Sequence, residues 1–240
     1  MQPAVSHGWS LDAEQARKLQ AKMAALVVSE DRLPERIRTV AGVDAAYAGE
    51  GTDAFAAVAV IDVASNCLEE LVAAEEPVRF PYVPGLLSFR EIPVLAAALK
   101  KLSVRPDLLI CDGQGIMHPR RFGLACHLGV IYDLPTIGCA KTHLVGSTHE
   151  PGFERGNFSS IVYNGETVGA LLRTRNGVRP LYVSPGHRIS LRTACDWTLM
   201  LCQRYRIPEP IRIAHQVVTK KKQEAAIDKK GSKRGTVNKS

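Results

Sequence analysis

What the sequence lacks excludes several classes of protein. No stretch of its 240 residues approaches the roughly 20 consecutive apolar residues that a membrane-spanning helix needs. Residues 1–10 lack the charged and apolar regions of a secretory signal, so we expect a cytoplasmic protein with no membrane partner. The six cysteines form no CxxC pair. Neither a disulfide framework nor structural zinc is therefore expected.

Motifs for nucleotide cofactors and for serine hydrolases are missing as well. The segment Gly113-Gln114-Gly115 has no third glycine at the spacing of a dinucleotide fingerprint, and no P-loop occurs anywhere. The GxSxG turn that carries a nucleophilic serine is also absent. These absences argue against nicotinamide-dependent oxidoreductases, NTPases and serine hydrolases.

Positive charge is concentrated at one end of the chain. Residues 219–240 hold eight Lys/Arg and two Asp/Glu, a net charge of +6, which leaves 23 basic and 22 acidic residues, or +1, for residues 1–218. Large apolar residues are scarce in the basic segment, so we expect a folded domain over 1–218 and a disordered tail over 219–240. Such a tail either adds affinity for phosphates or only improves solubility, and both alternatives stay open.

The hydrophobic pattern predicts an α/β fold. Apolar runs over 38–48, 53–64 and 67–78 indicate an antiparallel meander, and the short runs over 107–111 and 135–140 suit central parallel strands. Helical spacing predicts helices over 11–29, 88–102, 121–130 and 190–205, with a last helix passing through His215. Residues 158–185 read as further strands with Asn-Gly turns. The result is a mixed sheet flanked by helices, with an additional C-terminal hairpin region.

Two aspartates stand out in these strands. Asp44 interrupts an apolar strand, and Asp112 directly follows the apolar run 108–111. Burying a carboxylate costs several kcal/mol unless it is paired or bound to a cation, although an aspartate at a strand end is equally often a turn former. If the two strands are neighbours, both carboxylates meet at one edge of the sheet and favour Mg²⁺ or Mn²⁺.

Three further residues are less informative by themselves. Glu91, in the first turn of a predicted helix, has the position of an exposed capping residue. Lys141 follows the strand 135–140, where it could stabilise a phosphate oxygen or simply lie on the surface. His215 is equally consistent with a half-buried structural histidine. Only their combination with Asp44 and Asp112 points to catalysis.

Six sequence blocks together resemble the endonuclease V family of deoxyinosine-directed repair nucleases. The most specific is PYVPGLLSFRE at residues 81–91. The others are AGVD at 41–44, DGQG with HPR between 112 and 120, GCAK at 138–141, SPGH at 184–187 and YRIPEP at 205–210. The resemblance covers about residues 13–218 and leaves out the basic segment.

This resemblance implies a ribonuclease H-like fold with a mixed five-stranded sheet between helices. It also implies that Asp44, Asp112 and Glu91 bind Mg²⁺, which Mn²⁺ can replace, that Lys141 stabilises the transition state and that His215 assists catalysis. Tyr82 would belong to a strand-separating wedge loop, and the flipped hypoxanthine would enter a nearby pocket. The residues expected to contact DNA are Pro81, Tyr82, Gly85, Arg90, Gly113, His118, Gly138 and Leu144.

From the resemblance we expect a monomeric, Mg²⁺-dependent DNA-repair endonuclease. It would cut the second phosphodiester bond 3′ to deoxyinosine and leave 3′-hydroxyl and 5′-phosphate ends. One alternative is an inosine-specific endoribonuclease of the same family, since no motif reports whether a 2′-hydroxyl is read. The other is a catalytically inactive nucleic-acid-binding protein, which leaves the carboxylates unexplained. The number of metal ions stays open.

Overall fold

A single sheet of eight strands runs through the molecule in the order β3-β2-β1-β4-β5-β8-β7-β6. The computed structural model describes residues 1–235, except for the side chains of residues 50 and 228–235. The strands are β1 (Thr39–Ala48), β2 (Asp53–Asp62), β3 (Cys67–Pro77), β4 (Leu108–Cys111), β5 (Thr136–Ala140), β6 (Phe158–Tyr163), β7 (Glu166–Leu172) and β8 (Leu181–His187). The helices are α1 (Ala13–Ala24), α2 (Leu87–Leu99), α3 (Leu124–Tyr132), α4 (Leu191–Leu201) and α5 (Glu209–Gly235), with a 3-10 turn η1 (Gly49–Gly51).

The strands that carry the two aspartates are neighbours. β1 pairs antiparallel with β2, β2 pairs antiparallel with β3, and the parallel strands β4 and β5 continue the sheet from the other edge of β1. In this register Cys111, the residue before Asp112, lies beside Val43, the residue before Asp44. The pairing therefore brings both carboxylates to one edge, as the sequence pattern predicts.

The mixed sheet flanked by helices is confirmed, but the expected number of five strands is wrong. The five expected strands are β3-β2-β1-β4-β5, and the C-terminal strands extend the same sheet instead of forming a separate hairpin region. β8 pairs antiparallel with β5 along residues 136–140, and β7 and β6 follow outward. This pairing satisfies backbone groups that β5 would otherwise expose as a sheet edge.

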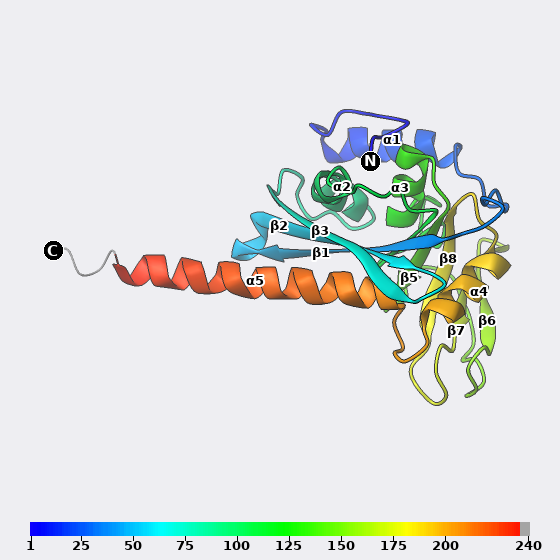
Figure 1. Ribbon diagram of the computed structural model, residues 1–240. Coiled ribbons are helices and arrows are strands. Elements are labelled where there is room, and N and C mark those ends of the chain that lie inside the picture. The colour runs from blue at the N-terminus through cyan, green and yellow to red at the C-terminus, as the bar shows by residue number, and fades with distance from the viewer. Residues whose placement is uncertain (236–240) are drawn as a thin grey trace.

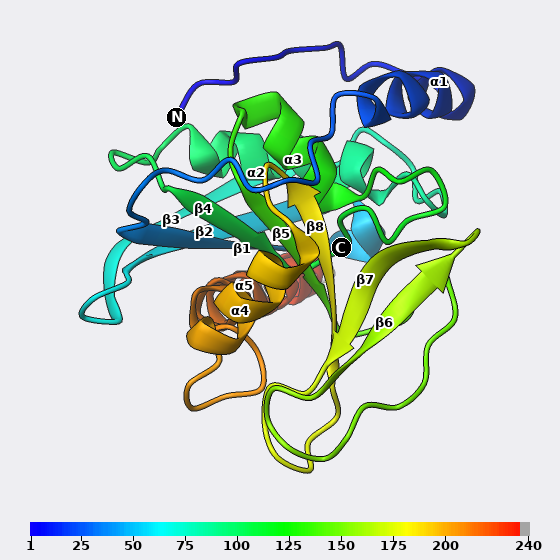
Figure 2. The ribbon, with the colours of Figure 1, turned by 90° about the vertical axis from the view of Figure 1, so that its right-hand side faces the viewer.

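Helices cover both faces of the sheet. α1, α2 and α3 lie over one face, and α4 and α5 lie over the other (Figures 1 and 2). α5 approaches β1 closely because Gly42 has no side chain. A Cβ atom at Gly42 would lie 2.2 Å from the carbonyl carbon of Pro210. This close approach sets the start of α5 against β1 and positions His215, one turn and a half further along, beside the strand.

The last helix is longer than the sequence pattern suggests. We expected order to end near Val218, whereas α5 continues to Gly235. Val218, 1% exposed, is the last buried residue among those described, so contact with the core does end there. The following Lys, Gln, Glu and Ala residues are strong helix formers and extend a helix that is already nucleated. Residues 236–240 of the expected tail lie outside the described residues.

None of the helices in the described part of the chain, α5 included, has the apolar length of a membrane span.

Candidate active site

Asp44, Asp112 and His215 form a compact cluster at the edge where β1 and β4 meet α5. Each offers one ligand atom, and these atoms all lie within 4.8 Å of one another. Nδ1 of His215 lies 2.7 Å from Oδ2 of Asp44. The side chains of Asp44 and Asp112 are only 10% and 15% exposed, whereas that of His215 is 52% exposed. The two carboxylates of the cluster are therefore buried, and the cluster is open to solvent on the side of His215.

The carboxylates of this cluster repel each other. Burial and the charge of Asp112 raise the pKa of Asp44, while His215 and Lys141 lower it. Lys141, directly after β5, donates a hydrogen bond from Nζ to Oδ2 of Asp112. Two buried carboxylates and one imidazole are a donor set that suits a divalent cation, which would relieve the repulsion. The residues present thus fit a metal site.

Glu91 is coupled to the cluster from the other face of the sheet. It lies on α2 and is 9% exposed, so it is not the exposed capping residue that its position suggested. Burial first, and then the charges of Asp44 and Asp112, raise its pKa to about 8. Among the described residues, the close group of ligand atoms includes His215 and does not include Glu91. A role for Glu91 as a metal ligand stays a prediction.

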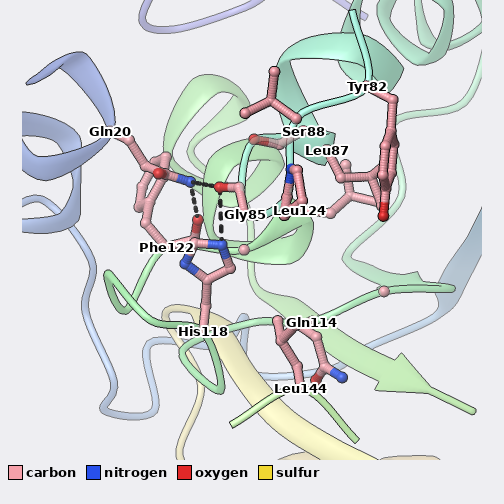
Figure 3. A pocket seen from close by; sticks show the side chains of 14 residues that line it. Gln20, Tyr82, Gly85, Leu87, Ser88, Gln114, His118, Phe122, Leu124 and Leu144 are labelled. Carbon is pink, nitrogen blue, oxygen red and sulfur yellow. Dashed lines mark hydrogen bonds between the residues drawn. The ribbon is translucent and has the colours of Figure 1, made fainter. Parts of the chain in front are cut away.

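A pocket of about 130 Å³ follows the cluster along the chain, and Figure 3 shows the residues that line it. Asp112 belongs to the cluster, and the next two residues, Gly113 and Gln114, are part of the pocket wall. The pocket and the cluster thus share one loop. The lining is mainly apolar and comes from α1, the loop before α2 and the start of α2, the loop after β4 and the start of α3, and the loop after β5: Gln20, Tyr82, Val83, Pro84, Gly85, Leu87, Ser88, Gly113, Gln114, His118, Phe122, Gly123, Leu124 and Leu144.

One wall of the pocket is fixed by the carbonyl oxygen of Gly85. It accepts hydrogen bonds from Nε2 of Gln20 at 3.1 Å, from Nε2 of His118 at 3.1 Å and from Nη2 of Arg120 at 2.7 Å. Because a carbonyl oxygen only accepts, Nε2 of His118 carries the proton. Burial, and secondly Arg120, lower the pKa of His118 to about 4, which keeps the ring neutral. Gly85 itself has a φ of +76°, which favours glycine at this position.

Gln114, a residue of the pocket wall, leaves one side-chain acceptor unused. Its Nε2 donates to the carbonyl oxygen of Thr142 at 3.1 Å, while its buried Oε1 has no hydrogen-bond partner among the described residues. An unpaired buried acceptor costs about 1–3 kcal/mol, so this oxygen favours a ligand that brings an N–H donor.

Five of the eight residues expected to contact DNA line this pocket, namely Tyr82, Gly85, Gly113, His118 and Leu144. Tyr82 is 70% exposed at the rim, and Pro81 before it is exposed but not part of the lining. The loop that the resemblance identifies as a wedge is therefore part of the pocket wall and its rim.

Two of the eight lie elsewhere. Gly138 is packed behind the pocket, where a Cβ atom would lie 2.3 Å from the backbone nitrogen of Gly115. Arg90 points toward the β1–β2 connection: its Nη2 donates to the carbonyl oxygen of Gly51 at 3.0 Å, and its guanidinium lies 4.5 Å from the ring centroid of Tyr47. In this arrangement Gly138 supports the pocket and Arg90 ties α2 to the hairpin.

Sequence reasoning missed Gln20 and Gln114 as pocket residues. Gln114 stands inside the block that follows Asp112, so its signal was a polar side chain between two glycines. Gln20 had a signal too, because it shares the buried stripe of α1 with Ala16 and Met23 at helical spacing. A glutamine on an apolar helix face needs hydrogen-bond partners, which Gly85 and Phe122 supply here.

Comparison with known proteins gives consistent matches over nearly the whole chain. A family profile described as endonuclease V matches residues 21–216. The endonuclease V of Nostoc punctiforme is 49% identical over 215 residues, which cover 90% of this chain and 97% of the relative. The crystal structure of endonuclease V from Streptomyces avermitilis superimposes with a TM-score of 0.86 at 43% identity, covering 92% of this chain and 98% of that one.

Solved structures similar to this chain include complexes with nucleic acid. Endonuclease V of Ciona intestinalis was solved in complex with a 23mer DNA that contains an inosine followed by a ribo-adenosine. It matches with a TM-score of 0.79 at 26% identity, over 90% of this chain and all of that one.

Proposed function

This chain belongs to the endonuclease V family, and from this premise we propose that it is a Mg²⁺-dependent endonuclease acting on DNA that contains deoxyinosine. The proposed cut is at the second phosphodiester bond 3′ to the lesion, with 3′-hydroxyl and 5′-phosphate ends. The position of the cut and the choice of Mg²⁺ rest on the family resemblance.

The observation that carries the proposal is the loop shared by the pocket and the carboxylate cluster. Enzymes that act on a damaged base take it out of the stack into a closely fitting pocket lined by apolar groups. Here the residues after Asp112 line such a pocket, while Asp112 itself belongs to a group that fits a divalent cation. A strand whose flipped base occupies the pocket would therefore present a nearby phosphate to the cluster.

The cluster supplies the elements of phosphodiester hydrolysis. We propose Asp44, Asp112 and Glu91 as metal ligands, and a bound Mg²⁺ would activate water and neutralise charge on the phosphate. The ammonium group of Lys141 lies at Asp112 and can stabilise charge that develops on the phosphate or the leaving oxygen. With Nδ1 engaged by Asp44, His215 has Nε2 left to hold a water molecule at the open side.

The pocket offers a chemical basis for reading hypoxanthine. Hypoxanthine carries a hydrogen on N1 where adenine has only a lone pair, and the free Oε1 of Gln114 is an acceptor for such a donor. Adenine at the same place would leave this oxygen unpaired, which costs about 1–3 kcal/mol. Gln114 is thus a candidate for distinguishing the deaminated base from the normal one.

A cleavage assay with matched strands tests this function. The substrates are DNA and RNA strands of one sequence, each with a single inosine, incubated with Mg²⁺ or with EDTA. Strands with adenine in place of inosine are the control. We expect a nick in the inosine DNA at the second bond 3′ to the lesion, only with Mg²⁺, and no cut in the adenine strand.

Other outcomes separate the alternatives. Cleavage of the RNA strand alone would replace the proposal by an inosine-specific endoribonuclease. Tight binding of inosine strands without cleavage in either Mg²⁺ or Mn²⁺ would replace it by a nucleic-acid-binding protein without catalysis. Equal cleavage of inosine and adenine strands would contradict the role of the pocket.

A further inference from the structure

The part of α5 beyond Val218 forms a basic arm, which we define as residues 219–235. It extends past the edge of the sheet as a straight continuation of the helix (Figure 1). The arm holds seven Lys/Arg and two Asp/Glu, a net charge of +5, whereas residues 1–218 carry only +1. Five of the seven net positive charges of the protein therefore lie on a segment that projects away from its core.

The arm is a continuation of the helix that carries His215. His215 is half exposed and borders the carboxylate cluster. Lys222 is exposed and follows seven residues later, about two turns, so it lies on the same face of the helix as His215. Lys220 follows after five residues and is rotated by about 140°. The helix thus presents Lys222 toward the side of the active site and Lys220 away from it.

The acidic residue Glu224 lies on the far face of the arm. It follows His215 by nine residues, about half a turn out of phase. Nζ of Lys220 lies 3.9 Å from Oε1 of Glu224, so the charge of Lys220 is partly balanced. Lys222 has no ion pair within the part of the chain whose side chains are described. Uncompensated positive charge therefore faces the side on which the substrate strand would be cut.

We propose that the arm binds the phosphate backbone of duplex DNA on one flank of the cleavage site, with Lys222 on the contact face. The proposal rests on the proposed function for the identity of the substrate. From His215 to Gly235 the helix spans about 30 Å, the length of about nine base pairs. Because the helix leaves the cluster in one direction, only one flank of the duplex can reach it.

The first experiment measures binding of a duplex without inosine, in EDTA, over a range of salt concentrations. Three variants are compared with the full chain: Lys222→Gln, the matched control Lys220→Gln, and a chain ending at Thr219, which keeps Val218. We expect Lys222→Gln to weaken binding about threefold and to reduce the slope of log affinity against log salt by about one unit. Lys220→Gln should change either quantity much less, and the truncation should reduce the slope by several units.

The second experiment varies the duplex on either side of an inosine, with cleavage as the readout. Shortening one flank below about nine base pairs should abolish the difference between the full chain and Lys222→Gln, while shortening the other flank should not. Cleavage of a single-stranded inosine oligonucleotide too short to reach the arm should be equal in both proteins. A thermal unfolding scan of each variant checks that the domain is folded.

Equal salt slopes for the full chain, Lys222→Gln and the truncated chain would overturn the proposal and leave the arm a solubilising segment. Equal effects of Lys222→Gln and Lys220→Gln would overturn the assignment of the contact face. Binding of phosphatidylserine vesicles that is tighter than binding of duplex DNA would replace DNA by a membrane surface. Because the first experiment uses DNA without inosine, its result holds even if the inosine cleavage assay fails.

Discussion

The pocket and the carboxylate cluster share one loop, but their polar groups are compensated in opposite ways. In the pocket wall, neutral donors from Gln20 and His118 and the guanidinium of Arg120 converge on one carbonyl oxygen. In the cluster, like charges converge, and burial together with repulsion raises the pKa of Asp44 and Glu91. The hydrogen bonds at Gly85 are complete without a ligand, whereas the cluster stores repulsion that a cation would relieve.

This contrast explains why the two regions should respond differently to mutation. A pocket that is already hydrogen-bonded loses stability when its support is disturbed. A cluster of repelling carboxylates loses function when one carboxylate is removed, with little effect on stability, because attraction and repulsion are lost together.

The largest effect is expected from Asp112→Asn, which keeps the shape of the side chain but removes its charge. Cleavage of inosine DNA should fall on the order of a thousandfold, because the site loses an oxygen ligand for the cation. The melting temperature should change little, since the variant loses one attraction, to Lys141, and two repulsions, from Asp44 and Glu91. A gel assay of cleavage and a thermal scan measure the two quantities.

The matched control for this variant is Asp196→Asn, which removes an exposed carboxylate on α4 paired with Arg192. It should leave both activity and stability unchanged. Near-normal Mg²⁺-dependent cleavage by Asp112→Asn would contradict its assignment to the metal site.

The second largest effect concerns Gly138→Ala, behind the pocket. The added Cβ would meet the backbone nitrogen of Gly115 at 2.3 Å, and backbone atoms on a packed strand cannot move away easily. The free energy of unfolding should fall by about 3 kcal/mol, measured by denaturant titration. Gly8→Ala is the control, because a Cβ there meets nothing within 4 Å. Equal stabilities of the two variants would show that the pocket wall is not under tight packing.

In EDTA, Glu91 at the cluster and His118 in the pocket wall should change the free energy of unfolding with pH in opposite directions. The folded pKa of Glu91, about 8, exceeds its ordinary value of 4.5, so its contribution to stability is lost as the pH rises from 4.5 to 8. The folded pKa of His118, about 4, is below its ordinary value of 6.5, so its contribution is lost as the pH falls from 6.5 to 4. Near pH 6 the two trends oppose each other.

Two variants separate these trends. Denaturant titrations at pH 7 and pH 5.5 measure how the free energy of unfolding changes with pH. Glu91→Gln should make stability fall more steeply on acidification, by up to about 1.4 kcal/mol per pH unit, and His118→Asn should make it fall less steeply. The same sign of change in both variants would contradict the contrast between cluster and pocket.

The smallest effect is expected at the rim, from Tyr82→Ala. Tyr82 is 70% exposed beside the pocket, where its ring can fill the gap left by an extruded base and offset the cost of unstacking. Cleavage of inosine in duplex DNA should fall about tenfold, with a smaller loss in single-stranded DNA, because no pair has to be opened there. Equal losses on both substrates together with a lower melting temperature would indicate that Tyr82 only packs its own loop.

Much of the candidate site followed from local sequence patterns. Apolar runs in the sequence predict the strands. Asp44 within one run and Asp112 directly after another are notable because burying a carboxylate costs free energy. The blocks around residues 81–91 and 112–120 contain four of the expected residues that line the pocket, namely Tyr82, Gly85, Gly113 and His118. These features depend on neighbours within a few residues, which a sequence contains directly.

Other features were decided only when distant segments met. β8 pairs with β5 because β5 offers an unpaired strand edge. Glu91 is buried because α2 packs on the sheet, and Arg90 binds the carbonyl oxygen of Gly51 because the β1–β2 connection lies within its reach. The length of α5 was also misjudged, because composition shows how little apolar surface a segment can bury but not that a nucleated helix already precedes it. The sequence alone determined which residues are candidates for the chemistry. The tertiary structure decided which of them share a site, because burial and hydrogen bonding between elements far apart in the chain set their positions and charges.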